Sequence, residues 1–97
     1  MTFQARLRHI MQVGNLRVAD LARWFGRPHA TVRGWVEQGI EPGGGPLDIK
    51  HIHALLDLLE AAAKPKRNGP KLLPVPIGYG PKDRKTYLSD LRLRLLP

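Results

Sequence analysis

The chain has 97 residues, no cysteine and a formal net charge of +8 at pH 7. This is the length of a single domain, and the absence of cysteine excludes disulfides and thiolate metal sites. The opening MTFQARLRHIMQ carries arginines inside its apolar pattern, and no stretch approaches the roughly 20 apolar residues of a membrane span. We therefore expect no signal peptide, no membrane contact and a cytoplasmic location in a bacterial cell or phage-infected host.

The charge is distributed unevenly along the chain. Residues 1–33 contain six arginines and one acidic residue, and residues 34–63 contain five acidic residues and one lysine. Residues 64–97 contain nine basic residues and two acidic ones. Two basic segments that flank an acidic one favour a protein with one side facing a polyanion. A merely soluble basic protein is the alternative that charge alone leaves open.

Two helices are predicted before residue 27. The first is predicted because apolar residues recur at positions 3, 7, 10 and 11 with helical spacing, and the Gly14-Asn15 pair ends it. The second begins near Val18 and ends at Gly26, since glycine takes the left-handed C-terminal conformation without penalty. Trp24 is offset from the apolar face of this second helix, so we expect it to be partly exposed.

A third short helix is predicted from Pro28 or His29 to Gly39. Its apolar residues Val32, Trp35 and Val36 face inward. The second and third helices, joined by a few residues headed by glycine, predict a helix-turn-helix unit. Ala22 supplies the small side chain that lets the two helices cross closely.

A fourth helix is predicted after the flexible loop IEPGGGP. Asp48 is expected to cap it, and Leu47 to pack on Ile52 as a hydrophobic staple. Pro65 forbids its continuation. The apolar stripe consists of Ile49, Ile52, Leu55, Leu56 and Leu59.

Residues 64–81 form a basic Pro/Gly-rich arm by composition. Its cations are Lys64, Lys66, Arg67 and Lys71. They would lie along phosphates or enter a minor groove of DNA. The alternative is that the arm is only a solubilising linker. Its apolar residues, expected to pack on this domain or on a neighbouring subunit, are Leu72, Leu73, Val75, Ile77 and Tyr79.

Residues 82–97 predict a C-terminal helix, with Pro81 at its start. The alternation in LRLRL keeps a strand open as the alternative, but the length and the Leu and Arg content favour the helix. This helix is a candidate oligomerisation element, and its seam would consist of Tyr87, Leu88, Leu91 and Leu95.

Residues 3–62 resemble the lambda-repressor-like (XRE-like) helix-turn-helix family. The resemblance is carried by Leu21-Ala22, Gly26, Thr31-Val32, Trp35, Gly39, Pro42 or Pro46, and Leu55-Leu56-Leu59. It implies an all-α, four-helix DNA-binding domain over residues 1–63. It also implies that the third helix enters the major groove of double-stranded DNA with its N-terminal residues at the base edges.

Carried over position by position, the resemblance implies two sets of DNA contacts. The base-contacting set is His29, Ala30, Arg33 and Gly34, in which Arg33 alone is able to make a bidentate contact, with guanine as its expected target. The phosphate-contacting set is Arg17, Arg23, Arg27 and Thr31.

No catalytic site, metal site or cofactor is expected. His51 and His53 are two residues apart on a helix and point in different directions, so they do not share an ion. The hydroxyl residues are scattered and lack an organised histidine and carboxylate.

The sequence therefore predicts a sequence-specific DNA-binding protein, a bacterial or phage transcriptional regulator such as a repressor, acting as a homodimer or higher oligomer. Two alternatives stay open. One is a phage accessory protein for DNA packaging or recombination, such as a small terminase subunit or an excisionase-like factor. The other is a protein–protein adaptor that docks a partner through an exposed Trp24 and the apolar tail.

Overall fold

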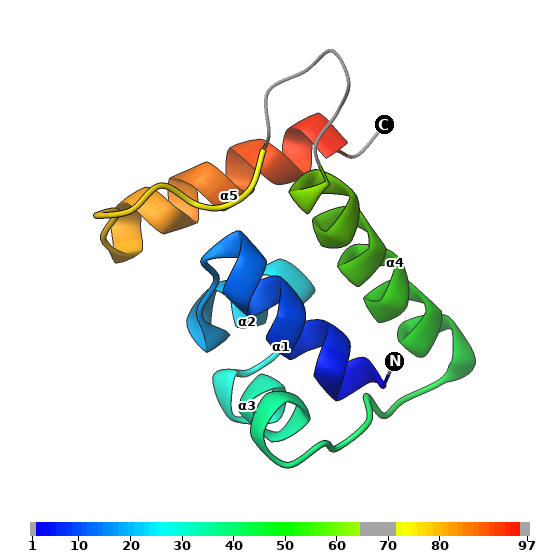
Figure 1. The fold of residues 1–97 in the computed structure, drawn as a ribbon. Coiled ribbons are helices and arrows are strands. Elements are labelled where there is room, and N and C mark those ends of the chain that lie inside the picture. The colour runs from blue at the N-terminus through cyan, green and yellow to red at the C-terminus, as the bar shows by residue number, and fades with distance from the viewer. Residues whose placement is uncertain (1, 65–71, 96–97) are drawn as a thin grey trace.

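The chain folds into five α-helices (Figure 1), and the structure, a computed structural model, describes residues 2–64 and 72–95. The helices are α1 (Phe3–Gly14), α2 (Val18–Phe25), α3 (His29–Glu37), α4 (Pro46–Ala63) and α5 (Pro81–Leu95). No strand occurs in these two ranges. The all-α class is thus confirmed, and so is the helical alternative for the C-terminal segment.

The first two helices end where the sequence predicts. Asn15 follows α1 in the left-handed conformation with φ of 52°. Gly26 follows α2 with φ of 66°, and a β-carbon at this position would have no neighbour within 4 Å. The backbone conformation alone therefore favours glycine at residue 26.

The start of α4 differs from the prediction. Gly45, not Asp48, is the N-cap residue, and Pro46 occupies the first turn, where its fixed φ and missing N–H are tolerated. Asp48 lies in the first turn, and its carboxylate accepts a hydrogen bond from the Gly45 N–H at 3.2 Å. Leu47 is 82% exposed, so the predicted staple with Ile52 does not form.

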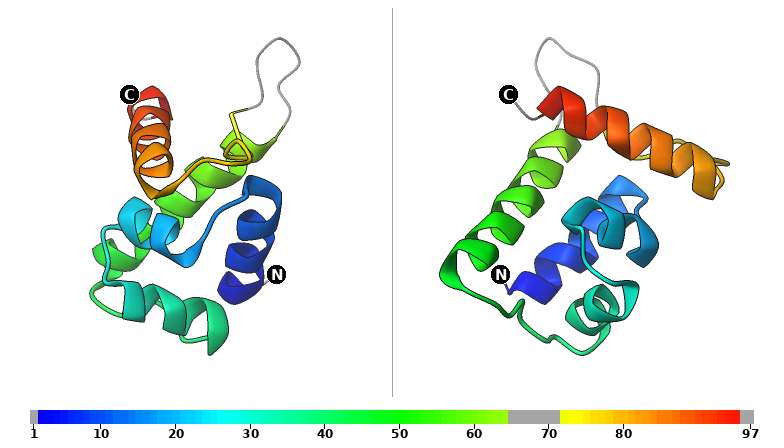
Figure 2. Two further views of the ribbon diagram at one scale, coloured as in Figure 1. Left: turned by 90° about the vertical axis from the view of Figure 1, so that its left-hand side faces the viewer. Right: turned by 180° about the vertical axis from the view of Figure 1, so that it is seen from behind.

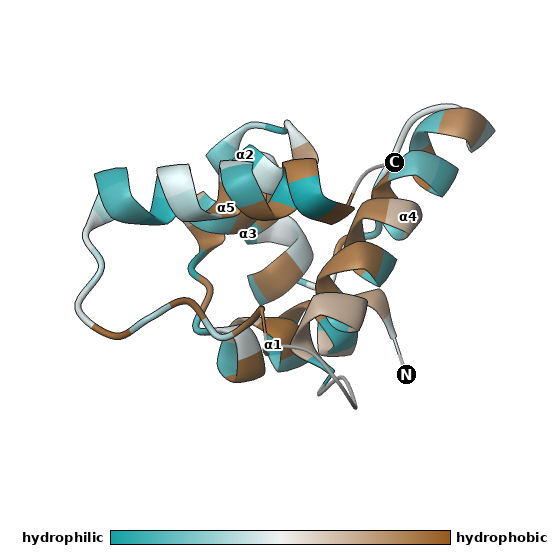
Figure 3. Cartoon of the chain, turned by 90° about the horizontal axis from the view of Figure 1, so that it is seen from above, coloured by the Kyte–Doolittle hydropathy of each residue, from teal (hydrophilic) through white to brown (hydrophobic). Residues whose placement is uncertain are grey.

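The helices surround one hydrophobic core. α1 contacts α3 and α4, while α2 contacts α3, α4 and α5. As a result α3 and α5 lie at opposite ends of the molecule, with α1 and α2 between them (Figures 1 and 2). In the hydropathy-coloured view, α4 carries its apolar residues among hydrophilic ones (Figure 3). The buried residues of α4 are Ile52, Leu55, Leu56, Leu59 and Ala62.

Trp24 belongs to this core, which corrects the expectation that it is partly exposed. It is 3% exposed, and its indole Nε1–H donates a hydrogen bond to the Leu55 carbonyl at 2.9 Å. The guanidinium of Arg92 lies 5.9 Å from the ring centroid. Trp24 is buried because α4 and α5 both pack on α2. The apolar periodicity of α2 alone does not reveal these contacts. The exposed tryptophan on which the adaptor alternative relied is therefore absent.

The segment before α5 lies against the core for part of its length. The Leu73 and Val75 side chains are fully buried, and the Val75 N–H donates to the Gly14 carbonyl at 2.9 Å. The Asn15 side-chain amide in turn donates to the Val75 carbonyl at 2.8 Å. Ile77, in contrast, is 97% exposed, so it does not pack on this domain, and its packing on a neighbouring subunit stays a prediction.

The apolar face of α5 packs within the same chain. Leu88 and Leu91 are 4% and 3% exposed, because they enter the core shared by the other helices. Tyr87 is half-buried and its hydroxyl donates to the Leu72 carbonyl, while Leu95 packs against the core edge. The expectation that this face forms a seam open to a second copy is corrected accordingly.

A buried ion pair fixes α5 on α2. Arg84 Nη1 lies 2.8 Å from Asp20 Oδ2, and the two side chains are 4% and 2% exposed. The same Nη1 donates to the Asn15 carbonyl at 2.7 Å, and Asp20 also accepts from the Arg17 N–H at 2.8 Å. Each charge therefore has its partners, which a buried charge requires.

Candidate nucleic-acid interface

The helix α3 has one side in the core and one side in solvent. Val32, Trp35 and Val36 are buried. Four side chains of α3 that are expected at DNA are exposed to solvent. They are His29, Ala30, Thr31 and Arg33. The sequence thus predicted these four exposed positions correctly.

Aromatic packing holds α3 in place. The Trp35 ring makes edge-to-face contacts with Phe3 of α1 and Phe25 of α2, with centroid distances of 5.8 Å to each. Such pairs contribute about 0.5–1.5 kcal/mol each beyond the area they bury. The exposed side of α3 is therefore presented by a helix whose orientation is fixed from two directions.

The C-terminal end of α3 is held by two side chains of α1. The Val36 carbonyl accepts hydrogen bonds from Gln4 Nε2 and from Arg8 Nε, both at 3.0 Å. A cation at a helix C-terminus also interacts favourably with the helix dipole. Arg8 is not among the site residues that the sequence predicts. The sequence feature that could have indicated Arg8 is the absence of an acidic residue three or four positions away on the same helix.

The N-terminal end of α3 has open backbone donors. Its N-cap residue is Pro28, which makes no side-chain capping hydrogen bond. The first N–H groups of a helix lack intrahelical acceptors and attract anions. Arg27, half-buried in the preceding turn, donates to the Gly26 carbonyl at 3.4 Å.

The arginines expected at phosphates do not all lie together. Arg17 is exposed at the N-cap of α2, and Arg27 directly precedes α3. Arg23 lies beside α5, where it lines a cleft with Lys85 and Ser89. The structure thus separates Arg23 from the exposed side of α3.

Two residues of α3 modify the expected base-contacting set. Gly34 is half-buried, and a β-carbon there would come within 3.3 Å of the Ile40 side chain, because the chain after α3 folds back over it. Glu37 is exposed one turn after Arg33, although it is not among the site residues that the sequence predicts. A carboxylate at this end of α3 repels phosphates and suits only an amino group such as that of cytosine.

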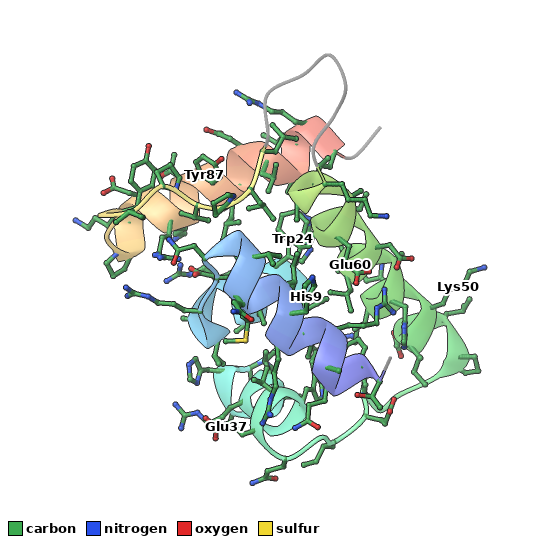
Figure 4. All side chains as sticks on the ribbon, viewed as in Figure 1. His9, Trp24, Glu37, Lys50, Glu60 and Tyr87 are labelled. Carbon is green, nitrogen blue, oxygen red and sulfur yellow. The ribbon has the colours of Figure 1, made fainter. Side chains whose placement is uncertain are left out.

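The tail lies away from α3 in the described residues. In both views of Figure 2, α5 and the segment before it lie at one end of the molecule and α3 at the other. In Figure 4, Tyr87 and Glu37 mark these two ends. Of the basic arm, Lys64 is exposed after α4. The other arm residues, Lys66, Arg67 and Lys71, lie outside the described residues.

Acidic residues of α4 are paired with an arginine of α1. Arg6 donates to Glu60 Oε2 through Nε at 3.2 Å, and its Nη2 lies 2.7 Å from Asp57 Oδ1. The hydrogen bond to Glu60 raises the pKa of Arg6 above its ordinary value, against a smaller opposing effect of burial and with further help from Asp57. This arginine is therefore committed to the fold and not to a ligand.

The histidines of α4 have different surroundings. His51 is exposed, whereas His53 is half-buried with its ring centroid 5.1 Å from that of Phe3.

Within the two described ranges, no helix combines the length and the apolar composition that crossing a membrane requires.

Comparison with known proteins gives no relative: no family model, curated protein or solved structure matches the chain.

Proposed function

We propose that this chain is a sequence-specific double-stranded DNA-binding protein of the helix-turn-helix type, a transcriptional regulator of bacterial or phage style. The observation that carries the proposal is the division of α3. Its inner side is anchored by Trp35, and its outer side offers His29, Ala30 and Arg33 to solvent. A recognition helix needs this combination, because base edges are read only by side chains held at a fixed orientation.

Three further features support the proposal. α2 and α3 are joined by residues 26–28, a connection of the length that helix-turn-helix units use. The open N–H groups at the start of α3 and the neighbouring Arg17 and Arg27 suit phosphate contacts. The formal net charge of +8 favours association with a polyanion. The resemblance of residues 3–62 to the lambda-repressor-like family points the same way.

Pairing of two copies on DNA stays a prediction. Its seam does not consist of Leu88 and Leu91, because both are covered within the chain. A role in phage DNA packaging or recombination would use the same DNA-binding surface, and the target sequence would distinguish it from regulation.

The test measures affinity for duplexes selected from random sequence. Arg33→Ala should lower affinity for the preferred duplex by about tenfold or more and relax sequence preference at one position. Arg17→Ala should weaken binding to all duplexes alike. Lys50→Ala removes the same charge from an exposed position that points away from α3 in Figure 4, so it should leave the affinity unchanged. Equal losses in Arg33→Ala and Lys50→Ala would refute base reading by α3.

Salt dependence provides a second readout of the same proposal. Each phosphate contact releases counterions, so affinity should fall by about one power of ten or more between roughly 50 and 200 mM salt. Arg17→Ala should make this dependence shallower, whereas Lys50→Ala should not. An affinity that is indifferent to salt would contradict binding to DNA.

A further inference from the structure

A cleft with a volume of about 270 Å³ lies between α2 and α5. The helix α5 lies at the opposite end of the molecule from α3 (Figure 2). The residues that line it are Arg23, Trp24, Lys85, Leu88, Ser89 and Arg92. The family resemblance implies a phosphate contact for Arg23 alone among them, and the proposed function uses none of them.

The α5 helix has a basic side that faces the cleft. Lys85, Ser89 and Arg92 recur at i, i+4 and i+7, so they share the side that faces the cleft. The acidic residues Asp83 and Asp90 line a different hollow. The cleft is therefore bordered by three cations, and no carboxylate is among its described lining residues.

The nearest buried carboxylate, Asp20, is shared between Arg84 and Arg23. Asp20 Oδ2 is held by Arg84 at 2.8 Å and by the Arg17 N–H at 2.8 Å. Arg23 Nη1 lies 3.8 Å from the other oxygen, beyond hydrogen-bond distance. Arg23 therefore makes only a long ion pair, with a carboxylate that Arg84 also balances, so Arg23 keeps N–H donors for a ligand at the cleft.

The floor of the cleft is apolar and rigid. Trp24 and Leu88 are 3% and 4% exposed, and the indole of Trp24 is fixed by its hydrogen bond to Leu55. Arg92 donates one N–H to the Trp24 carbonyl at 3.2 Å, which orients its guanidinium and leaves further donors. An apolar wall lowers the local dielectric and strengthens the attraction of an anion to cations around it.

We propose that this cleft binds a phosphate group. A phosphate carries one charge as a backbone diester and up to two as a free group, and it offers more acceptor oxygens than a carboxylate. It therefore suits the three cations and the Ser89 hydroxyl that line one cleft. The group would belong either to a free phosphate-bearing molecule or to the backbone of a duplex. The proposal does not depend on base reading by α3, since none of the cleft residues lies on that helix.

The test is a titration of the full chain with inorganic phosphate against chloride at constant ionic strength. Amide and indole resonances are followed by NMR. The Trp24 indole and Ser89 amide signals should shift and saturate, and Lys85→Gln or Arg23→Gln should weaken this binding by about tenfold. Lys82→Gln removes the same charge from an exposed position of α5 outside the cleft, so it should bind phosphate as the unaltered chain does. All three side chains are exposed, and unchanged remaining signals verify the fold.

Two results would overturn the proposal. One is a response to phosphate that does not saturate or that chloride reproduces. The other is an equal loss in Lys82→Gln and Lys85→Gln, which would indicate diffuse attraction without a site.

The source of the phosphate is distinguished by adding a duplex. If the backbone is the source, the duplex shifts the same signals, and Lys85→Gln weakens binding to all sequences with a salt slope shallower by about one. If the source is a free molecule, Lys85→Gln binds the duplex as Lys82→Gln does while its phosphate binding is still lost. Failure of the Arg33→Ala experiment would leave the phosphate titration unaffected, so the two proposals fail separately.

Discussion

Asp20 is the side chain on which two distant parts of the chain converge. It accepts from the Arg17 N–H at the start of α2 and pairs with Arg84, which lies 64 residues further along the chain. The sequence presents it only as the single acidic residue in a basic segment. Its local role at the helix start is of a kind that sequence patterns indicate, whereas its pairing with Arg84 requires α5 to be placed.

Removing the charge of Asp20 should destabilise the protein. In Asp20→Asn the buried guanidinium of Arg84 loses its counter-charge, and breaking a buried pair costs about 3–5 kcal/mol. The free energy of unfolding, measured by urea denaturation, should fall by this amount. Asp90→Asn, the same change at an exposed position of α5, should alter it by less than about 0.5 kcal/mol. Similar losses in both variants would mean that the pair contributes nothing specific.

The turn between α2 and α3 sets how these helices meet. Its first residue, Gly26, has φ of 66° and open space where a β-carbon would lie. The rings of Phe25 in α2 and Trp35 in α3 contact each other across the turn, so residues close in the sequence position the two helices.

The helix ends at Asn15 and Gly26 could be predicted because they depend on residues within one helical turn. The start of α4 differs from the predicted one because Pro46 and Asp48 are both typical of a helix start. In the structure the helix begins at Pro46.

Replacing Gly26 tests whether conformation alone requires glycine. Gly26→Ala should lower the free energy of unfolding by about 1 kcal/mol, since an L-residue resists the left-handed region while no atom obstructs its side chain. Gly43→Ala is the control, because that position has the same open space and a φ outside the left-handed range. It should leave the unfolding midpoint in urea almost unchanged. A Gly43→Ala loss as large as that of Gly26→Ala would rule out the conformational explanation.

At the scale of the molecule, α5 is part of the core and not an appendage to it. The expectation of a separate C-terminal element followed from the run of prolines and glycines between residues 64 and 81. Leu73, Val75, Leu88 and Leu91 nevertheless enter the same core as α1, α2 and α4. The proposed DNA-binding surface and the cleft at α5 therefore share one hydrophobic core, and α2 contributes to both.

A matched pair of leucines on α5 measures this integration. Leu91 is 3% exposed and Leu93 is 77% exposed. Leu91→Ala should cost about 2–5 kcal/mol of unfolding free energy through the cavity it leaves, and Leu93→Ala less than about 0.5 kcal/mol. Thermal unfolding followed by circular dichroism should show a single transition for each variant. A stable core that melts unchanged in Leu91→Ala would show that α5 is dispensable.

By itself the sequence determined the all-α class, the ends of the first helices and most of the residues of α3 that face solvent, because these depend on the apolar spacing and turn residues of short segments. Only the tertiary structure decided the burial of Trp24, the pairing of Asp20 with Arg84 and the gathering of Arg23 with Lys85 and Arg92. Each of these brings together side chains that are about 30 to 70 residues apart, and no local pattern specifies such contacts. They arise because α2 buries a second side beneath α4 and α5.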